Sequence, residues 1–115
     1  MAKATGIGGV FFRARDTVAL ARWYQTHLGI SDFWTQEAGP TVFAPFNADT
    51  DYFPADRQWM INLRVDDLDG LLDNLRLSGI AVETRPAEWD SLETGRFARI
   101  LDPEGNPVEL WQPPK

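Results

Sequence analysis

The chain has 115 residues, of which 43% are hydrophobic and 24% are charged, and these values are ordinary for one small globular domain. Its net charge of −6 and its scattered basic residues argue against nucleic acid or an acidic membrane as the main partner. The lack of cysteine excludes disulfides, cysteine-ligated zinc and thiol catalysis. No apolar run is long enough to cross a bilayer and the N-terminus has no apolar signal core, so a cytoplasmic location is expected.

Two segments have the anatomy of an amphipathic helix. The first begins at Asp16 and ends at Gly29, and the second begins at Asp66 and ends at Gly79, so the two lie 50 residues apart. In each, apolar residues recur at i, i+3 and i+4 spacing, while Asp can cap the first N–H groups and Gly can take the left-handed C-terminal conformation. The sequence therefore predicts helices near 17–28 and 67–78.

Short strand patterns surround both helices. They occupy residues 7–14, 30–36 and 41–46 around the first helix, and 59–65, 80–85, 96–101 and 107–112 around the second. The polar segment 47–57 is rich in turn-forming residues and separates module one (about 6–46) from module two (about 58–112). A strand–helix–strands unit that occurs twice predicts a single α+β domain in which the helices cover one face of each sheet.

Successive side chains of a strand point to opposite faces of the sheet, so the sequence predicts which residues share a face. Ile61, Leu63 and Val65 are expected to pack under a helix, as are Val108 and Leu110 in the last strand. The opposite faces collect arginine, asparagine, glutamate and aromatic side chains, which suits a ligand cleft better than it suits bulk solvent. The candidate ligand-binding residues on these faces are Phe11, Arg13, Asn62, Arg64, Arg99 and Trp111, with Glu109 among them.

Glu109 is a carboxylate in an otherwise apolar strand pattern. If Leu101 faces Pro107 across the turn, Arg99 lies directly opposite Glu109, and such a pair contributes roughly 0.2–1 kcal/mol. Glu109 is then a structural or ligand-orienting partner of Arg99, a metal ligand, or a catalytic base whose pKa is raised by burial. The sequence leaves these alternatives open.

The two helix openings and the last hairpin carry a resemblance to a known group of proteins. The stretch from Val10 to Gly29, which ends in HLG, the INLRVDDLD stretch at 61–69 and the DPEGNPVELW stretch at 102–111 together resemble the vicinal oxygen chelate superfamily. That superfamily includes glyoxalase I, bleomycin-resistance proteins, fosfomycin-resistance enzymes and extradiol dioxygenases. The resemblance implies two βαβββ modules whose mixed sheet curls around a cup, with helices on its outer face. It also implies a homodimer, with the cup closed within one chain or across two.

The resemblance also gives the positions of a possible metal site. In metal-dependent members, His and Glu side chains from the first and last strands of each module hold a divalent cation. In this chain those positions fall on Gly9, near Val42, on Met60 and on Glu109. Gly and Val offer no donor, and a thioether is a poor ligand for Mg, Mn or Zn, so no metal or other cofactor is expected.

Two small-molecule functions follow from the resemblance, beside a third in which the chain is a structural or regulatory partner with a degenerate cup. One is a metal-independent lyase or isomerase in which Glu109 is the base and an arginine stabilises an oxyanion. The other is non-catalytic sequestration of a small molecule or drug, as in bleomycin-resistance proteins. Arginines among aromatic residues favour a small anionic or aromatic ligand in either case. The sequence specifies neither the substrate nor whether a reaction occurs.

Several aromatic residues have expected roles near the ligand. Trp34 and Trp111 are expected to contact it, while Tyr52 and Phe53 are expected to form a cup rim or a dimer contact. Trp89 lies in a loop that is long enough to be a lid.

Overall fold

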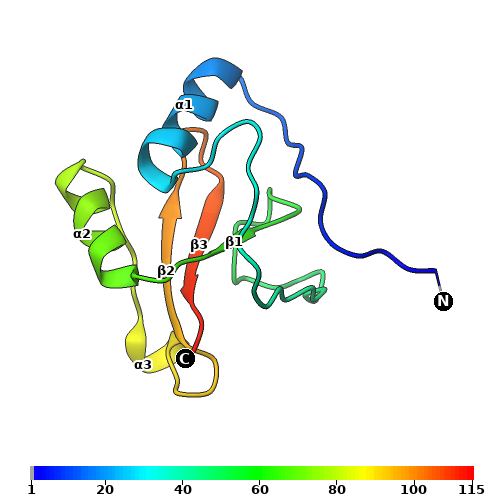
Figure 1. The fold of residues 1–115 in the computed structure, drawn as a ribbon. Helices are drawn as coiled ribbons and strands as arrows, with labels where there is room; N and C mark the ends of the chain where they lie inside the picture. Colours follow the sequence, from blue (N-terminus) through cyan, green and yellow to red (C-terminus); the bar gives the residue numbers. More distant parts are fainter. Residues whose placement is uncertain (1) are drawn as a thin grey trace.

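The computed structural model describes residues 2–115, and within them it contains three helices and one three-stranded sheet. In chain order the elements are α1 (Thr17–Leu28), β1 (Ile61–Arg64), α2 (Leu68–Leu77), α3 (Pro86–Trp89), β2 (Arg96–Leu101) and β3 (Pro107–Gln112). Figure 1 shows α1 and α2 on the same side of the sheet, while the N-terminal segment runs away from it. Within residues 2–115 we find no helix with the length and apolarity needed to span a bilayer.

Both long helices form where the apolar periodicity predicts them. α1 begins after Asp16, whose side chain accepts a hydrogen bond from an N–H of the first turn, and it ends at Gly29 with a φ of 71°. α2 begins after Asp67, whose Oδ1 accepts a hydrogen bond from the Gly70 N–H. The expected cap at Asp66 is wrong by one residue, because the Asp67 carboxylate is the one that reaches the N–H three residues ahead.

The sheet is mixed and open. β3 lies in the centre, where β1 pairs with it in parallel and β2 pairs with it in antiparallel orientation. β2 and β3 span the predicted ranges, whereas β1 is shorter than the predicted 59–65. The strand expected at 80–85 is reduced to a single bridge between Glu83 and Arg99.

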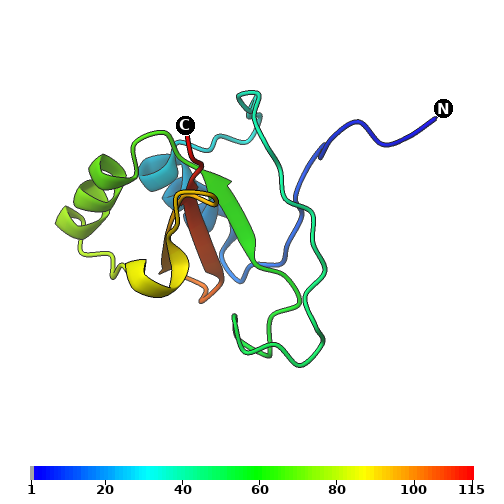
Figure 2. The same ribbon diagram turned by 90° about the horizontal axis from the view of Figure 1, so that it is seen from below.

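The strands predicted for module one are wrong. Segments 7–14, 30–36 and 41–46 form no strand. Their alternating pattern favours an extended chain, but a strand also needs a neighbouring backbone with which to exchange hydrogen bonds. In Figure 2 the chain before α1 runs out into solvent, away from the sheet. Two complete βαβββ modules are therefore not confirmed, and the sheet does not curl closed around a cup.

The core packs between the helices and one face of the sheet. Its buried residues are Leu20, Tyr24, Leu63, Leu68, Leu72, Leu75, Ala98, Ile100, Val108 and Leu110. Full burial of a leucine contributes about 1.5–3 kcal/mol, so the three α2 leucines are the main attachment of that helix. The predicted inward orientation of Leu63, Val108 and Leu110 is confirmed, which leaves the alternate residues on the opposite face of the sheet.

The turn between β2 and β3 is hydrogen-bonded to α1 and to the backbone just before it. Asp102 is buried and accepts hydrogen bonds from the Tyr24 hydroxyl (2.7 Å) and from the side-chain and backbone nitrogens of Asn106. Glu104 accepts two hydrogen bonds from the backbone N–H groups just before α1. The DPEGN motif is therefore a structural joint between the first helix and the last hairpin.

Candidate ligand-binding site

Three polar side chains lie in a row across the sheet, on the face opposite the helices. The parallel register pairs Asn62 with Glu109, and the antiparallel register pairs Glu109 with Arg99. Because residues paired across strands point to the same face, Asn62, Glu109 and Arg99 share this face. The predicted position of Arg99 opposite Glu109 is confirmed.

Glu109 is 7% exposed, and both oxygens of its carboxylate accept hydrogen bonds. Oε1 accepts from Nδ2 of Asn62 (2.7 Å), and Oε2 accepts from the hydroxyl of Tyr52 (2.5 Å). A buried carboxylate needs such donors, because burial of an unpaired charge is costly. Across residues 2–115 Glu109 takes part in no ion pair, so Arg99 faces it without a salt bridge.

The guanidinium of Arg99 lies against two aromatic rings. Its Cζ is 4.6 Å from the centre of the Tyr52 ring and 5.5 Å from that of Trp89. Contacts of this kind orient a guanidinium through its flat face and do not use its N–H groups. The Nε and Nη2 atoms of Arg99 are buried and have no hydrogen-bond partner in the described part of the chain. Arg99 therefore has unused hydrogen-bonding capacity next to Glu109.

Tyr52 reaches this row from the segment that joins the two halves of the chain. Its ring also contacts Phe46 (centroids 5.7 Å apart) and meets Trp89 edge-on (6.3 Å). Burial, followed by the hydrogen bond to Glu109 and the charge of Glu109, raises the pKa of Tyr52 to about 12, while the charge of Arg99 opposes this shift. The phenol is therefore a neutral hydrogen-bond donor at neutral pH.

The role of Tyr52 at the centre of the site was missed by sequence reasoning, which expected a rim or dimer contact. Tyr52 and Glu109 are 57 residues apart, and no local pattern marks a contact over that distance. The available signal was a lone tyrosine inside a polar, turn-rich segment.

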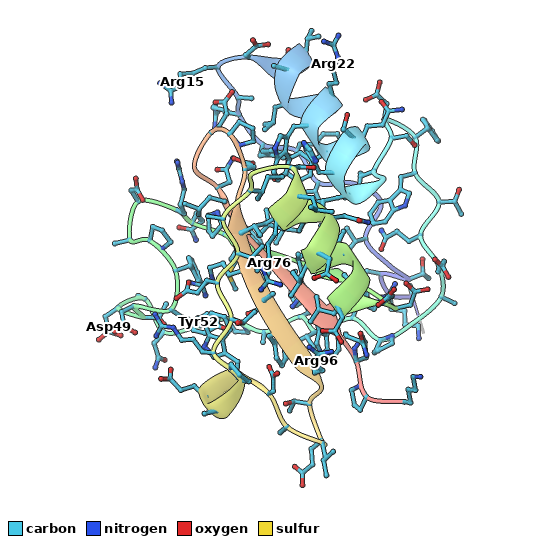
Figure 3. The ribbon with its side chains drawn as sticks, turned by 90° about the vertical axis from the view of Figure 1, so that its left-hand side faces the viewer. Arg15, Arg22, Asp49, Tyr52, Arg76 and Arg96 are labelled. Carbon is cyan, nitrogen blue, oxygen red and sulfur yellow. The ribbon has the colours of Figure 1, made fainter. Side chains whose placement is uncertain are left out.

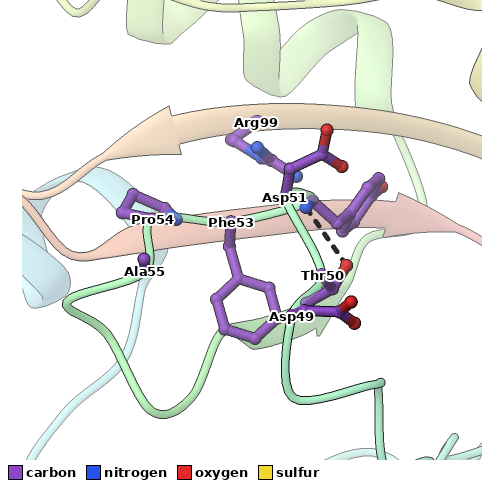
Figure 4. Close-up of a pocket in the computed structure, with 8 residues that line it drawn as sticks. Asp49, Thr50, Asp51, Phe53, Pro54, Ala55 and Arg99 are labelled. Atoms are coloured by element: carbon purple, nitrogen blue, oxygen red, sulfur yellow. Dashed lines mark hydrogen bonds between the residues drawn. The ribbon is translucent and has the colours of Figure 1, made fainter.

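An open pocket of about 540 Å³ adjoins Tyr52 (Figure 4). It is lined by residues 49–55 and by Arg99, so Arg99 belongs both to the pocket and to the polar row. Figure 3 shows Tyr52 and Asp49 close together at one side of the molecule, away from Arg15 and Arg22 at its top. The pocket combines a guanidinium, two aspartates and the ring of Phe53.

Arg64 and Trp111 share the face of the row but are engaged in structural contacts. The register pairs them directly across β1 and β3. Arg64 donates hydrogen bonds to the backbone oxygens of Glu37 and Pro40 (2.7 Å each). Trp111 is buried, and its Nε1 donates to the backbone oxygen of Thr94 (2.7 Å).

Phe11 and Arg13 are not brought to the row. Both belong to segment 7–14, which pairs with no strand, and both are exposed, Phe11 at 96%. The expected convergence of all the candidate residues on one cleft is therefore reduced to Asn62, Arg99 and Glu109, with Arg64 and Trp111 beside them. Trp34, the other expected ligand contact, is 45% exposed.

The residues do not fit the divalent metal site of the superfamily. Both oxygens of Glu109 are already hydrogen-bonded, and Gly9, Val42 and Met60 provide no oxygen or nitrogen side-chain donor. In the part of the chain that the structure describes, no group of three or more His, Cys, Asp or Glu residues could hold a metal ion. A hard cation requires several such ligands.

Comparisons with known proteins agree with this fold. The glyoxalase-like domain family matches residues 9–111, and no curated protein is significantly similar. Among solved structures, the chain is similar to TnmS3, an antibiotic binding protein from Streptomyces sp. CB03234, with 28% identity, coverage of 96% of this chain and 99% of that chain, and a TM-score of 0.54. In fold it is similar to the trypanothione-dependent glyoxalase I of Leishmania major, with 18% identity, coverage of 88% and 81%, and a TM-score of 0.56. The chain belongs to the glyoxalase-like domain family, within the vicinal oxygen chelate superfamily.

Proposed function

We propose that this domain binds a small aromatic or anionic molecule at the face formed by Asn62, Glu109 and Arg99, and that it sequesters this molecule without a metal. The observation that carries the proposal is the state of Arg99. Its guanidinium is oriented by the rings of Tyr52 and Trp89 while two of its nitrogens have no partner among residues 2–115. Unpaired buried donors favour a ligand that brings an acceptor.

Sequestration is favoured over catalysis by the state of Glu109. Both of its oxygens accept hydrogen bonds from side chains of the same chain, so Glu109 serves in this arrangement as an acceptor for Asn62 and Tyr52. The similar protein TnmS3 is described as an antibiotic binding protein, which supports binding as the activity of this architecture. The aromatic rings of Phe46 and Trp89, which lie around the Tyr52 ring, offer stacking surface for a flat ligand.

A metal-independent lyase or isomerase is the second candidate. It is favoured by one observation, which is that Glu109 is a buried carboxylate hydrogen-bonded to a titratable phenol. If Tyr52 moves away, Glu109 becomes a buried base. Glu109→Gln separates the two functions. If the domain only binds its ligand, both the wild type and the variant leave the ligand chemically unchanged, whereas an enzyme loses turnover in the variant.

We also propose that the domain forms a homodimer. Large apolar side chains are exposed along the segments that form no strand, including Phe11, Phe33 and Phe43. The outer edge of β1 has no partner strand within residues 2–115. Exposed apolar surface and open sheet edges favour association, and a second copy would cover both. Light scattering at micromolar concentration should give twice the chain mass, and a monomer would contradict this proposal.

The function is tested by titrating the purified protein with aromatic acids, neutral aromatics and aliphatic amines while tryptophan fluorescence and heat are recorded. Aromatic compounds should bind, since Trp89 and Arg99 lie at the site, and aliphatic amines should not. Ligand recovered after long incubation should be chemically unchanged. If no aromatic compound binds at millimolar concentration, the proposal is wrong.

A further inference from the structure

We infer that the Tyr52 side chain occupies the ligand's place, and that the ligand is a phenol whose ring lies on Arg99 and whose hydroxyl donates to Glu109. The inference rests on the proposed function and names the class of ligand for that site. Tyr52 is therefore an internal competitor that must leave before the ligand can enter.

Tyr52 meets the polar row and Trp89 through its hydroxyl, its ring face and its ring edge. Its hydroxyl donates to Oε2 of Glu109, its ring lies over the Arg99 guanidinium, and its edge meets Trp89. With the contact to the Phe46 ring, these are one hydrogen bond, one cation–π contact and two aromatic contacts, all made by a single p-hydroxyphenyl group. The site is thus complementary to a phenol in shape, in polarity and in the position of the hydrogen-bond acceptor.

The segment that carries Tyr52 is held mainly by hydrogen bonds within itself. Between residues 47 and 56, the backbone hydrogen bonds are local turns. They run from the Thr50 N–H to the Asn47 oxygen, from the Tyr52 N–H to the Thr50 hydroxyl and from the Arg57 N–H to the Pro54 oxygen. In the described chain, the hydrogen bond that leaves this stretch comes from the Tyr52 side chain, and the next anchor is Arg57, which donates to the Glu104 oxygen. Tyr52 can therefore swing out without breaking any ladder of the sheet.

Tyr52 leaves two nitrogens of the Arg99 guanidinium without a hydrogen-bond partner among residues 2–115. These atoms, Nε and Nη2, are buried beside the Tyr52 ring. A phenol with an oxygen acceptor near its hydroxyl would give Glu109 the same donor and would also pair with Arg99. Such a ligand therefore makes more hydrogen bonds in this place than Tyr52 does, which favours displacement of Tyr52 at sufficient ligand concentration.

The test is chemical rescue with p-cresol, which is the tyrosine side chain without its backbone. Tyr52→Ala should bind p-cresol at least tenfold more tightly than the wild type does, because the competitor has been removed. It should also bind p-cresol at least tenfold more tightly than toluene, which fills the same space but cannot donate to Glu109. Titration calorimetry measures the affinities of both proteins for both compounds, and circular dichroism confirms that the variant is folded.

Two further variants keep the test decisive. Trp59→Ala removes an exposed ring outside the pocket, and it should show no preference for p-cresol over toluene. Tyr52→Phe keeps the ring and loses the donor, so its p-cresol affinity should rise at least threefold over the wild type. If Tyr52→Ala does not fold, an unchanged affinity in Tyr52→Phe overturns the inference.

The outcomes separate this inference from the function on which it rests. If Tyr52→Ala binds toluene as well as p-cresol, or binds p-cresol no better than the wild type, the inference is wrong. If the wild type nevertheless binds other aromatic compounds, the proposed binding function stands. If neither the wild type nor Tyr52→Ala binds any aromatic compound, both are wrong.

Discussion

The Tyr24 hydroxyl donates a 2.7 Å hydrogen bond to Oδ2 of Asp102 inside the core, across 78 residues of sequence. Tyr24 lies on α1 and Asp102 lies in the turn between β2 and β3, so this bond joins the first half of the chain to the last hairpin. The same carboxylate also holds the turn through Asn106. One buried side chain thus positions both the helix and the strand that carries Glu109.

Tyr24→Phe should lower the free energy of unfolding by about 1–3 kcal/mol, because it leaves a buried carboxylate oxygen of Asp102 with one donor fewer. Urea denaturation followed by circular dichroism measures this loss. Val18→Ala, at an exposed position of the same helix, is the matched control and should stay within about 0.5 kcal/mol of the wild type. Equal midpoints for Tyr24→Phe and the wild type would show that the bond contributes nothing.

The two tyrosines should resist ionisation in the native protein. Burial, with the acidic partners Asp102 and Glu109, raises the pKa of Tyr24 and Tyr52 above the ordinary value of 10.0, that of Tyr52 to about 12. Absorbance at 295 nm at pH 10 should therefore show little tyrosinate in native protein and about half ionisation in urea. Native and unfolded protein with the same titration curve would contradict this.

The same shifts set the sign of the pH dependence of stability. A phenol whose folded-state pKa is raised keeps its proton longer in the native state than in the unfolded state. The contribution of the Tyr52 phenol to the free energy of unfolding is therefore complete below pH 10, and it is lost as the pH rises toward 12. Between pH 10 and pH 12, the urea midpoint should fall less steeply for Tyr52→Phe than for the wild type. If the midpoints of the two proteins fall equally steeply, the raised pKa of Tyr52 is contradicted.

The start of α2 provides a test of helix capping with an adjacent control. Asp67 accepts a 3.0 Å hydrogen bond from the Gly70 N–H, so Asp67→Ala should cost about 0.5–2 kcal/mol. Asp66 is exposed and is not the capping residue, so Asp66→Ala should have a much smaller effect. Thermal or urea denaturation compares the stability of the two variants. A larger loss of stability in Asp66→Ala than in Asp67→Ala would place the cap at Asp66.

Arg99 and Arg64 should differ in their effect on ligand binding. Arg99→Met should weaken binding of an aromatic acid by about 1.5–3 kcal/mol, the range expected for a hydrogen bond to a charged group. Arg64 already donates to the backbone oxygens of Glu37 and Pro40, so Arg64→Met should weaken binding less. Calorimetric titration of both variants with the same compound makes the comparison. A larger loss in Arg64→Met would move the site toward segment 37–40.

The parts of the fold that follow from local chemistry could be predicted from the sequence. α1 needs an aspartate cap, an apolar stripe and a terminal glycine, all of which lie within 14 residues of one another. The β2–β3 hairpin needs two alternating runs and a tight turn, and these also fix Arg99 opposite Glu109. Short-range patterns therefore predict α1, α2 and the β2–β3 hairpin, and they place β1 within a longer predicted strand.

The remaining features depend on contacts between distant segments. Residues 7–14 have the alternation of a strand, yet the sequence does not say which backbone would pair with them, and no strand forms. Tyr52 reaches Glu109 because the turn-rich segment 47–57 folds back over the sheet, which no periodicity indicates. For the same reason only part of the candidate site was predicted, namely Asn62, Arg99 and Glu109 without Tyr52.

The most direct test of ligand binding at Arg99 is a nuclear magnetic resonance titration that follows arginine Nε–H and tryptophan indole signals as an aromatic ligand is added. The Arg99 Nε–H and Trp89 indole signals should shift together and saturate with the ligand, because both groups flank the ring of Tyr52. The Arg76 signal, on the exposed surface of α2, should stay in place. Saturation of binding with the Arg99 and Trp89 signals unmoved would show that the ligand binds elsewhere.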